Sequence, residues 1–171
     1  MKKDKKGCGH VKIAKTNAMR ILDQKNIPYE VMTYEAKDGA IDGVSVAKKI
    51  GYPIEMVYKT LVTQSSSKNF FVFVIPVDKE LDLKKAAKSV GEKRVEMIAV
   101  KDITKYTGYV RGGCSPVGMK KIYVTTFHED AQNLEQIIVS GGKIGLQIKL
   151  APSDLVSICS GQYADMVKKE E

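Results

Sequence analysis

The fold is decided by residues 57–77, which read VYKTLVTQSSSKNFFVFVIPV. Residues 58–64 are rich in β-branched and aromatic side chains, which favour strands, and residues 65–69 (SSSKN) are typical of a tight turn. The apolar run at residues 70–77 shows no polar alternation, so it is typical of a strand that is buried on both faces. These three segments together predict a central hairpin.

The sequence on either side of this hairpin predicts short helices and strands that do not alternate regularly. Helices are expected after an N-cap at Thr16, at residues 46–50 after Ser45, at residues 83–90 after Asp82, and after Ser153; strands are expected at residues 29–35, 95–99, 121–126, 136–140 and 144–150, with Gly141 and Gly142 as the turn between the last two. This mixture predicts an α+β fold, a single domain over residues 13–167 in which helices surround a mixed sheet. Neither GxGxxG nor GxxxxGKS/T occurs, so no motif for a dinucleotide or a nucleoside triphosphate is present.

Composition limits the possible classes of protein. With 171 residues, of which 43% are apolar and 28% charged, the chain has the size and character of one globular domain. The longest apolar run is far shorter than the roughly 20 residues that cross a bilayer, and no secretory signal follows the N-terminal lysines. We therefore expect no membrane contact and a cytoplasmic location.

The cysteines and histidines do not form a metal-binding pattern. Cys8 and His10 could supply two ligands, but His128 is the only other histidine and a closed zinc site needs four ligands. The other cysteines, Cys114 and Cys159, are widely spaced and form no CxxC pair, which favours a reducing compartment over a disulfide framework. We expect neither a metal nor a cofactor.

The net charge of +8 suggests a nucleic-acid partner, but its distribution weakens that interpretation. Residues 1–15 hold six lysines against one aspartate, and residues 1–12 are expected to form a flexible basic tail. The chain from residue 16 onward carries only +3. Such a body binds a polyanion weakly by bulk charge, so any nucleic-acid specificity must come from local geometry or from a partner.

Lys59 is the first candidate for chemistry. Strand alternation places it on the same side as Val57 and Leu61, so one lysine shares a face with apolar neighbours. Either the side chain extends to solvent at the edge of the sheet, or it reaches a cleft as a buried cation. Only the second interpretation requires a polar or anionic ligand.

Two glycine-containing loops are the other candidates. Glycine pairs at residues 112–113 and 141–142 let backbone groups approach a ligand closely. An ordinary tight turn explains the first pair equally well, and a hairpin turn explains the second pair better, because strands are expected on both sides of it. Cys114 could be a nucleophile beside Arg111, but a small buried thiol is the commoner state. His128 stands in a segment (FHED) that resembles a solvated turn, so no histidine base or catalytic triad is indicated.

Five blocks of sequence, in this order and with this spacing, resemble the YbaK/EbsC family. They are VYKTL at residues 57–61, LDLKKAA at 81–87, KRVEM at 93–97, TGYVRGGCSPVG at 107–118 and VSGGK at 139–143. The resemblance extends over residues 15–165 and is closest to the YbaK-type Cys-tRNA(Pro) deacylases, which are similar to the editing domain of bacterial prolyl-tRNA synthetases. It implies that the mixed sheet is curved.

The resemblance implies a trans-editing enzyme that hydrolyses the ester between a wrongly attached amino acid, usually cysteine, and the 3′ end of tRNA(Pro). The implied nucleophile is the substrate's own thiol, which fits a chain without a triad or a metal site. The family's lysine corresponds to Lys59 and its loop glycine to Gly112, so these two residues have the implied catalytic roles. Substrate-binding roles are implied for Tyr34, Thr60, Gly113, Ser140 and Gln147.

Gln147 departs from the family pattern, which has an aspartate at this position. A neutral amide cannot form the charge-assisted hydrogen bond with a substrate ammonium that a carboxylate forms, so cysteine, alanine and serine all remain open as the amino acid removed. The alternative function is a non-catalytic module that binds an amino-acid-like ligand or a protein. Because the chain has no RNA-reading motif, the resemblance implies that prolyl-tRNA synthetase is the partner that selects the tRNA.

Deleting residues 1–12 removes five lysines and one aspartate, a net charge of +4. We expect the truncated chain to keep its turnover of saturating substrate but to bind tRNA more weakly at low salt, with the difference fading as salt rises. Titrations of tRNA binding at several salt concentrations measure this. Equal affinities of the two chains at low salt would mean that the tail does not meet the RNA.

Overall fold

The predicted hairpin is confirmed in the computed structural model, which describes residues 13–169; the tail at residues 1–12 lies outside them. β2 (Tyr58–Ser65) and β3 (Phe70–Pro76) pair antiparallel, with Lys59 opposite Ile75. Every residue of β3 after the first is buried, as its unbroken apolar run predicts.

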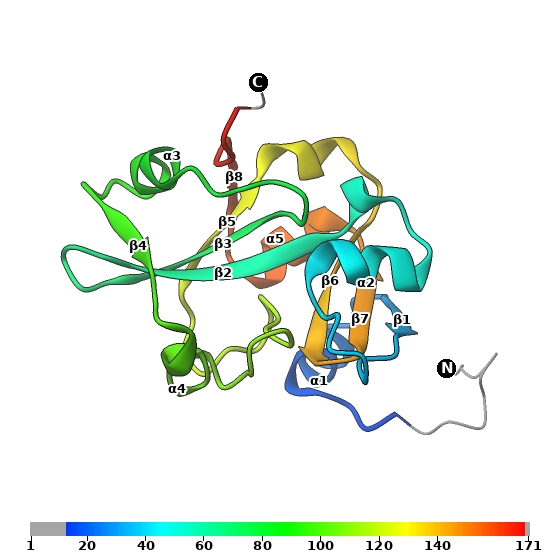
Figure 1. Ribbon diagram of the computed structural model, residues 1–171. Helices are drawn as coiled ribbons and strands as arrows, with labels where there is room; N and C mark the ends of the chain where they lie inside the picture. The colour runs from blue at the N-terminus through cyan, green and yellow to red at the C-terminus, as the bar shows by residue number, and fades with distance from the viewer. Residues whose placement is uncertain (1–12, 170–171) are drawn as a thin grey trace.

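The hairpin lies inside a five-stranded sheet with the order β4–β2–β3–β5–β8 (Figure 1). The other strands are β4 (Val95–Met97) and β8 (Gln162–Ala164) at the two edges and β5 (Val124–His128) between β3 and β8. β4 is antiparallel to β2, whereas β5 is parallel to β3 and β8 is parallel to β5, so the sheet is mixed, as predicted. The sequence does not predict β8, because three residues are too few to show a strand period.

A second, antiparallel sheet contains β1 (Glu30–Thr33), β7 (Leu146–Leu150) and β6 (Ile137–Lys143), in that order. The turn predicted at Gly141 and Gly142 is wrong, because both glycines lie within β6, where the register shifts between Ser140 and Lys143. The chain reverses at Gly145, whose φ of 92° is a conformation that residues with a side chain rarely adopt.

Five α-helices and three short 3₁₀ helices accompany the sheets within residues 13–169. They are α1 (Asn17–Gln24), α2 (Gly43–Ile50), α3 (Leu83–Ser89), α4 (Ile103–Thr107) and α5 (Pro152–Ile158), with the 3₁₀ helices η1 (Ile54–Met56), η2 (Val100–Asp102) and η3 (Glu129–Asn133). The α+β class is therefore confirmed. No helix in this described part of the chain is both long and apolar enough to cross a membrane.

Two of the predicted helix caps are wrong. Asp42, rather than Ser45, caps α2, because its carboxylate accepts hydrogen bonds from the backbone N–H of Ser45 at 3.1 Å and from the Ser45 hydroxyl at 2.6 Å. Ser153 lies inside α5, which begins at Pro152, a residue whose fixed φ suits the first helical position.

Side chains from both sheets meet in the main core. One face of the five-stranded sheet contributes Tyr58, Val62, Val74 and Phe127, which join Ile148 and other buried residues of the second sheet and of α1. On the opposite face, β3 residues such as Phe73 pack with α3. β2 thus has one face in each cluster, and its position is strongly constrained.

His128 is buried, so the solvated turn predicted around it is wrong. It ends β5 with 3% of its surface exposed, and its Nδ1 accepts a hydrogen bond from the backbone N–H of Met166 at 3.3 Å. Its Nε2 lies 3.4 Å from a carboxylate oxygen of Asp130. The polar residues that follow His128 in the sequence conceal the fact that β5 is an inner strand.

Thr16 joins α1 to the second sheet. Its hydroxyl accepts a hydrogen bond from the Met19 N–H, which caps the helix, and donates one to the Gly141 carbonyl. We expect Thr16→Ala to lower the free energy of unfolding by about 1–2 kcal/mol, measured by urea denaturation, because both bonds are lost. Thr16→Ser keeps the hydroxyl and should stay close to wild type; an equal loss in both variants would assign the effect to the methyl group instead.

Candidate functional site

One edge of β2 is left uncovered between the two sheets. β4 pairs with β2 only at residues 63–65, and β6 reaches the same edge through an isolated bridge between Val57 and Ile138. Figure 1 shows β2 crossing the molecule with β4 near one end and β6 near the other. The Val62 carbonyl accepts a hydrogen bond from the Ile98 backbone N–H on this edge. Because successive residues of an antiparallel strand direct their backbone groups to alternate sides, the backbone of Thr60, two residues earlier, faces the same open edge.

A cleft of about 640 Å³ follows this open edge, a volume typical of sites for small ligands. Its lining comes from β2 and its approach (Val57, Tyr58, Lys59, Thr60, Leu61, Val62), from α2 and the loop before it (Gly39, Ile41, Asp42, Gly43, Val46), from β4 and the helices after it (Met97, Ile98, Val100, Ile103), from the glycine loop (Arg111, Gly112, Cys114) and from the second sheet (Ser140, Gln147), with Val77 beside them. The cleft therefore gathers residues from widely separated parts of the chain.

Lys59 brings a cation into this cleft. Its side chain is partly buried, and within residues 13–169 its ammonium has no hydrogen-bond or salt-bridge partner. Burial lowers the pKa of Lys59, and the more distant carboxylates of Glu80 and Asp78 offset part of that effect. Of the two interpretations left open by the sequence, the structure supports the cation in a cleft.

Three polar side chains of the cleft were predicted as substrate-binding residues. Thr60 has a buried hydroxyl without a hydrogen-bond partner in the described structure. Gln147 has 6% of its surface exposed and lies in β7 between Met32 of β1 and Ser140 of β6. The Ser140 hydroxyl accepts a hydrogen bond from the Gly142 N–H at 3.2 Å, which leaves its own proton free to be donated. Thr60, Gln147 and Ser140 thus offer hydrogen-bonding groups to a ligand.

Gly112 lines the cleft, whereas Gly113 lies behind it. Gly112 has a φ of 85°, and a Cβ added there would come within 2.7 Å of the Ile41 side chain, so glycine is needed for both reasons. A Cβ on Gly113 would meet the backbone of Lys143 and Ile144 at 2.8–3.1 Å. Gly113 therefore lets the glycine loop pack against the second sheet, and it is not part of the cleft lining.

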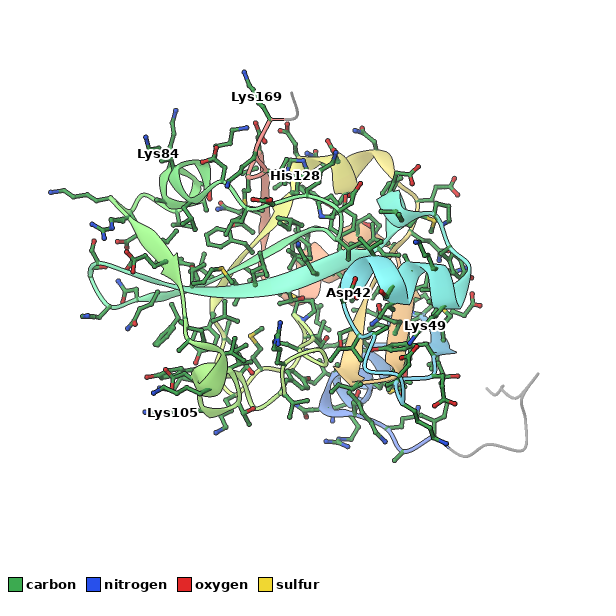
Figure 2. The ribbon with its side chains drawn as sticks, viewed as in Figure 1. Asp42, Lys49, Lys84, Lys105, His128 and Lys169 are labelled. Carbon is green, nitrogen blue, oxygen red and sulfur yellow. The ribbon has the colours of Figure 1, made fainter. Side chains whose placement is uncertain are left out.

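Tyr34 does not line the cleft either, but it belongs to the loop that forms one wall. The ammonium of Lys49, on α2, fastens this loop: it donates to the carbonyls of Glu35 at 2.6 Å and Ala40 at 3.0 Å and to the Asp38 carboxylate at 2.7 Å. Lys49 also lies 5.8 Å from the centroid of the Tyr34 ring. Figure 2 shows Lys49 and Asp42 together at the α2 side of the molecule.

Sequence reasoning did not select Asp42 and Arg111 as site residues, although both line the cleft. Hydrogen bonds from Ser45 lower the pKa of Asp42, so this carboxylate is a negative charge on the wall. Its signal was present, because an aspartate three residues before a serine is typical of a helix N-terminus. For Arg111, the only indication in the sequence was its position beside the glycine pair at residues 112–113.

The structure does not favour a protein nucleophile. Burial raises the pKa of the Cys114 thiol to about 11, so the thiol is protonated near neutral pH and is a poor nucleophile. His128, the single histidine of residues 13–169, does not line the cleft, and no cluster of metal-ligating side chains occurs in that part of the chain. Cys8 and His10, considered above as metal ligands, lie outside the described residues.

Comparison with known proteins assigns this arrangement to a class. The model of the aminoacyl-tRNA editing domain family matches residues 41–158, a stretch that contains every residue of the cleft lining except Gly39. The chain belongs to the aminoacyl-tRNA editing domain family.

Particular relatives agree with this assignment. The chain is 46% identical over 156 residues, 91% of its length and 95% of the relative's, to EbsC of Enterococcus faecalis, which is named as a candidate Cys-tRNA(Pro)/Cys-tRNA(Cys) deacylase. It is also similar to a proline–tRNA ligase of Fervidobacterium nodosum, with 28% identity over 96 residues. The matched stretch is 56% of this chain and 16% of the ligase. A solved structure described as a candidate trans-editing enzyme for prolyl-tRNA synthetase has the same fold, with a TM-score of 0.79, 21% identity and coverage of 90% of this chain and 96% of that one.

Lys59 should lower the stability of the folded protein. Because burial lowers its pKa, the charged form is disfavoured in the fold; this cost is present at neutral pH and disappears as pH rises through the folded pKa toward the unfolded value of 10.5. We expect Lys59→Met to raise the free energy of unfolding at pH 7 by about 0.5–2 kcal/mol, and less at pH above 10. Urea denaturation measures this.

Lys37→Met is the matched control, because Lys37 is exposed and lines no part of the cleft. Its stability should stay within about 0.5 kcal/mol of wild type at both pH values. A Lys59→Met variant that is less stable than wild type at neutral pH would contradict a desolvated cation.

Proposed function

We propose that this protein removes wrongly attached amino acids from tRNA by cleaving the ester between the amino acid and the terminal ribose, with Cys-tRNA(Pro) as the leading substrate. The observation that carries the proposal is the Lys59 ammonium, a cation in the cleft that has no hydrogen-bond or salt-bridge partner among residues 13–169. Membership of the editing domain family and the name of the 46% identical relative support this substrate class.

The cleft has the chemistry that an aminoacyl ester needs. Its mixed lining of apolar side chains and a few polar groups suits an amino acid together with part of the terminal nucleoside. Thr60, Ser140 and Gln147 supply donors and acceptors for the polar atoms of the ester and the amino group. Asp42 adds a negative charge that can attract the substrate's ammonium group.

For a cysteinyl ester, the substrate supplies its own nucleophile. The sulfur attacks the carbonyl carbon of the same residue, a C–S bond forms and the ester C–O bond breaks, and the thiol proton passes to the ribose oxygen. The products are a cysteine thiolactone and a tRNA with a free terminal hydroxyl. Oriented intramolecular reactions of this kind reach effective molarities of about 10⁵–10⁸ M, so holding the thiol near the carbonyl supplies much of the acceleration.

Lys59 acts on the charge that develops during this attack. Its ammonium lies in a cleft partly shielded from water, where a cation stabilises an oxyanion more strongly than in bulk solvent. The backbone of Gly112, which has no Cβ, lines the same cleft and contacts the aminoacyl group there. The protonated Cys114 thiol takes no part in bond formation.

In this proposal, prolyl-tRNA synthetase is the partner that selects tRNA(Pro). The reaction takes place in the cytoplasm. The similarity of this chain to a segment of a proline–tRNA ligase supports a link between the editing reaction and the enzyme that charges the tRNA. Proline and cysteine are similar in size, and a synthetase pocket separates near-isosteres by only about 1–3 kcal/mol, so a second site that rejects proline raises fidelity.

The test is a deacylation assay of the purified protein with Cys-tRNA(Pro), Ala-tRNA(Pro), Ser-tRNA(Pro) and Pro-tRNA(Pro). We expect rapid release of cysteine, slower release of alanine and serine, which lack a thiol, and no release of proline. Lys59→Ala should lower the rate on Cys-tRNA(Pro) by at least about 100-fold, in line with loss of one oxyanion-stabilising group. Lys37→Ala, the matched surface control, should retain the wild-type rate.

Three results would count against the proposal in different ways. No release from any of the mischarged tRNAs would favour the alternative of a non-catalytic binding module. Wild-type rates in Lys59→Ala would remove Lys59 from the chemistry. Loss of several orders of magnitude in a folded Cys114→Ala variant would favour covalent catalysis by the protein over attack by the substrate's thiol.

A further inference from the structure

The positive charge of the described chain is concentrated in one segment. Residues 84–121 contain ten lysines and arginines against three acidic residues, a net charge of +7. Residues 13–83 contain nine of each sign, and residues 122–169 contain four basic and five acidic residues. The rest of the described chain therefore has a net charge of −1, and the low overall charge conceals a strong local excess.

This segment forms one side of the molecule. It includes α3, β4 and α4, which lie along the left of Figure 1, and Lys84 and Lys105 extend outward from the upper and lower ends of that side in Figure 2. All of its lysines and arginines except Lys85 are exposed. We call the exposed lysines and arginines of residues 84–121 the basic strip.

Most of the basic strip is free to meet an outside partner. Within residues 13–169, the side chains of Lys84, Lys88, Lys93, Lys101, Arg111 and Lys121 have no hydrogen bond or salt bridge. By contrast, Arg94 is paired with Glu96 at 2.7 Å. A set of exposed cations on one side of the molecule, without partners in the described part of the chain, is the usual electrostatic footprint of a polyanion site.

A second groove connects the basic strip to the cleft. Its volume is about 480 Å³, and its lining includes the aromatic ring of Tyr106, two cations and two carboxylates (Lys68, Arg94, Glu96 and Asp102). Met97 and Ile98 line both this groove and the cleft that holds Lys59, so the two hollows adjoin. A polar groove with an aromatic ring suits single-stranded nucleotides, whose bases form hydrogen bonds and stack on aromatic faces, while the cations that their phosphates need lie on the adjoining basic strip.

We propose that the acceptor end of the tRNA lies on this side of the molecule, with the single-stranded nucleotides before the terminal adenosine in the second groove and the phosphates beyond them on the basic strip. The proposal rests on the proposed function, because that function places the terminal aminoacyl ester in the adjoining cleft. The geometry gives the RNA a direction: it leaves the cleft past Met97 and Ile98 toward β4 and α4.

The experiment compares two variants of equal net charge. The strip variant carries Lys93→Glu, Lys101→Glu and Lys105→Glu; the control variant carries Lys25→Glu, Lys37→Glu and Lys48→Glu, three exposed lysines of the electrically balanced segment. For both and for wild type, binding of uncharged tRNA(Pro) is titrated over a range of salt concentrations. Hydrolysis of Cys-tRNA(Pro) and of a cysteinyl ester of adenosine, which has no RNA beyond the terminal nucleoside, is measured in parallel.

We expect the strip variant to lose at least about ten-fold in affinity for uncharged tRNA at low salt, with the slope of log affinity against log salt reduced by about 2–3. Its kcat/KM on Cys-tRNA(Pro) should fall by a similar factor, while its rate on the cysteinyl adenosine ester stays within about two-fold of wild type. The control variant should change much less in every measurement.

Several outcomes would overturn the proposal. Equal losses in both variants would mean that only net charge matters, and unchanged tRNA affinity in the strip variant would leave the strip to another partner, such as an acidic protein. Loss of activity on the adenosine ester would place the effect in the cleft instead. If wild type hydrolyses neither substrate, the proposed function fails, but the binding titration of uncharged tRNA still decides whether the strip contacts RNA.

Discussion

β2 belongs to the five-stranded sheet and meets the second sheet at its start, and its outer edge is covered only at the two ends. β4 pairs with the C-terminal end of the strand, and β6 meets the residue before its start through the Val57–Ile138 bridge. The gap between them is where α2, the glycine loop and the segment after β4 converge on the strand. Since both faces of β2 are packed, the fold offers a ligand the strand's edge and the side chains beside it. The position of the cleft follows from how the strands are paired.

The placement of Lys59 shows how such a site combines folding with chemistry. Leu61, on the same face of β2, and Ile75, the cross-strand partner of Lys59, are apolar, and burial beside them removes water from the ammonium, which has no carboxylate partner among residues 13–169. A paired lysine would be electrostatically satisfied and of less use to a substrate. An exposed one would be screened by solvent. The partial burial seen here lies between these two states, and functional sites are where folds commonly accept such a cost.

The sequence predicts the hairpin, most of the helices and the importance of Lys59, because long apolar runs, caps and strand alternation are local signals. It fails where tertiary pairing overrides local preference: Gly141 and Gly142 resemble a turn but are held in β6, and His128 precedes polar residues but ends an inner strand. Thr60, Gly112, Ser140 and Gln147 were selected by resemblance to a family, and the structure brings them to one cleft. Tyr34 and Gly113 support its walls instead. Asp42 and the clamp formed by Lys49 depend on contacts between distant segments, which no local pattern encodes.

The open edge of β2 has a further consequence, for association between copies of the chain. An uncovered strand edge presents hydrogen-bonding groups on which another strand can pair, and natural proteins suppress such aggregation by recessing the edge or by placing a charge on the strand beside it. Here the uncovered stretch lies inside a cleft, and Lys59 stands within it as a charge that a second β-strand would have to desolvate further. The lysine for which we propose a role in the reaction therefore also protects this open edge of the sheet. Replacing Lys59 with an apolar residue therefore raises the stability of the fold but removes the charge that opposes pairing with a second strand.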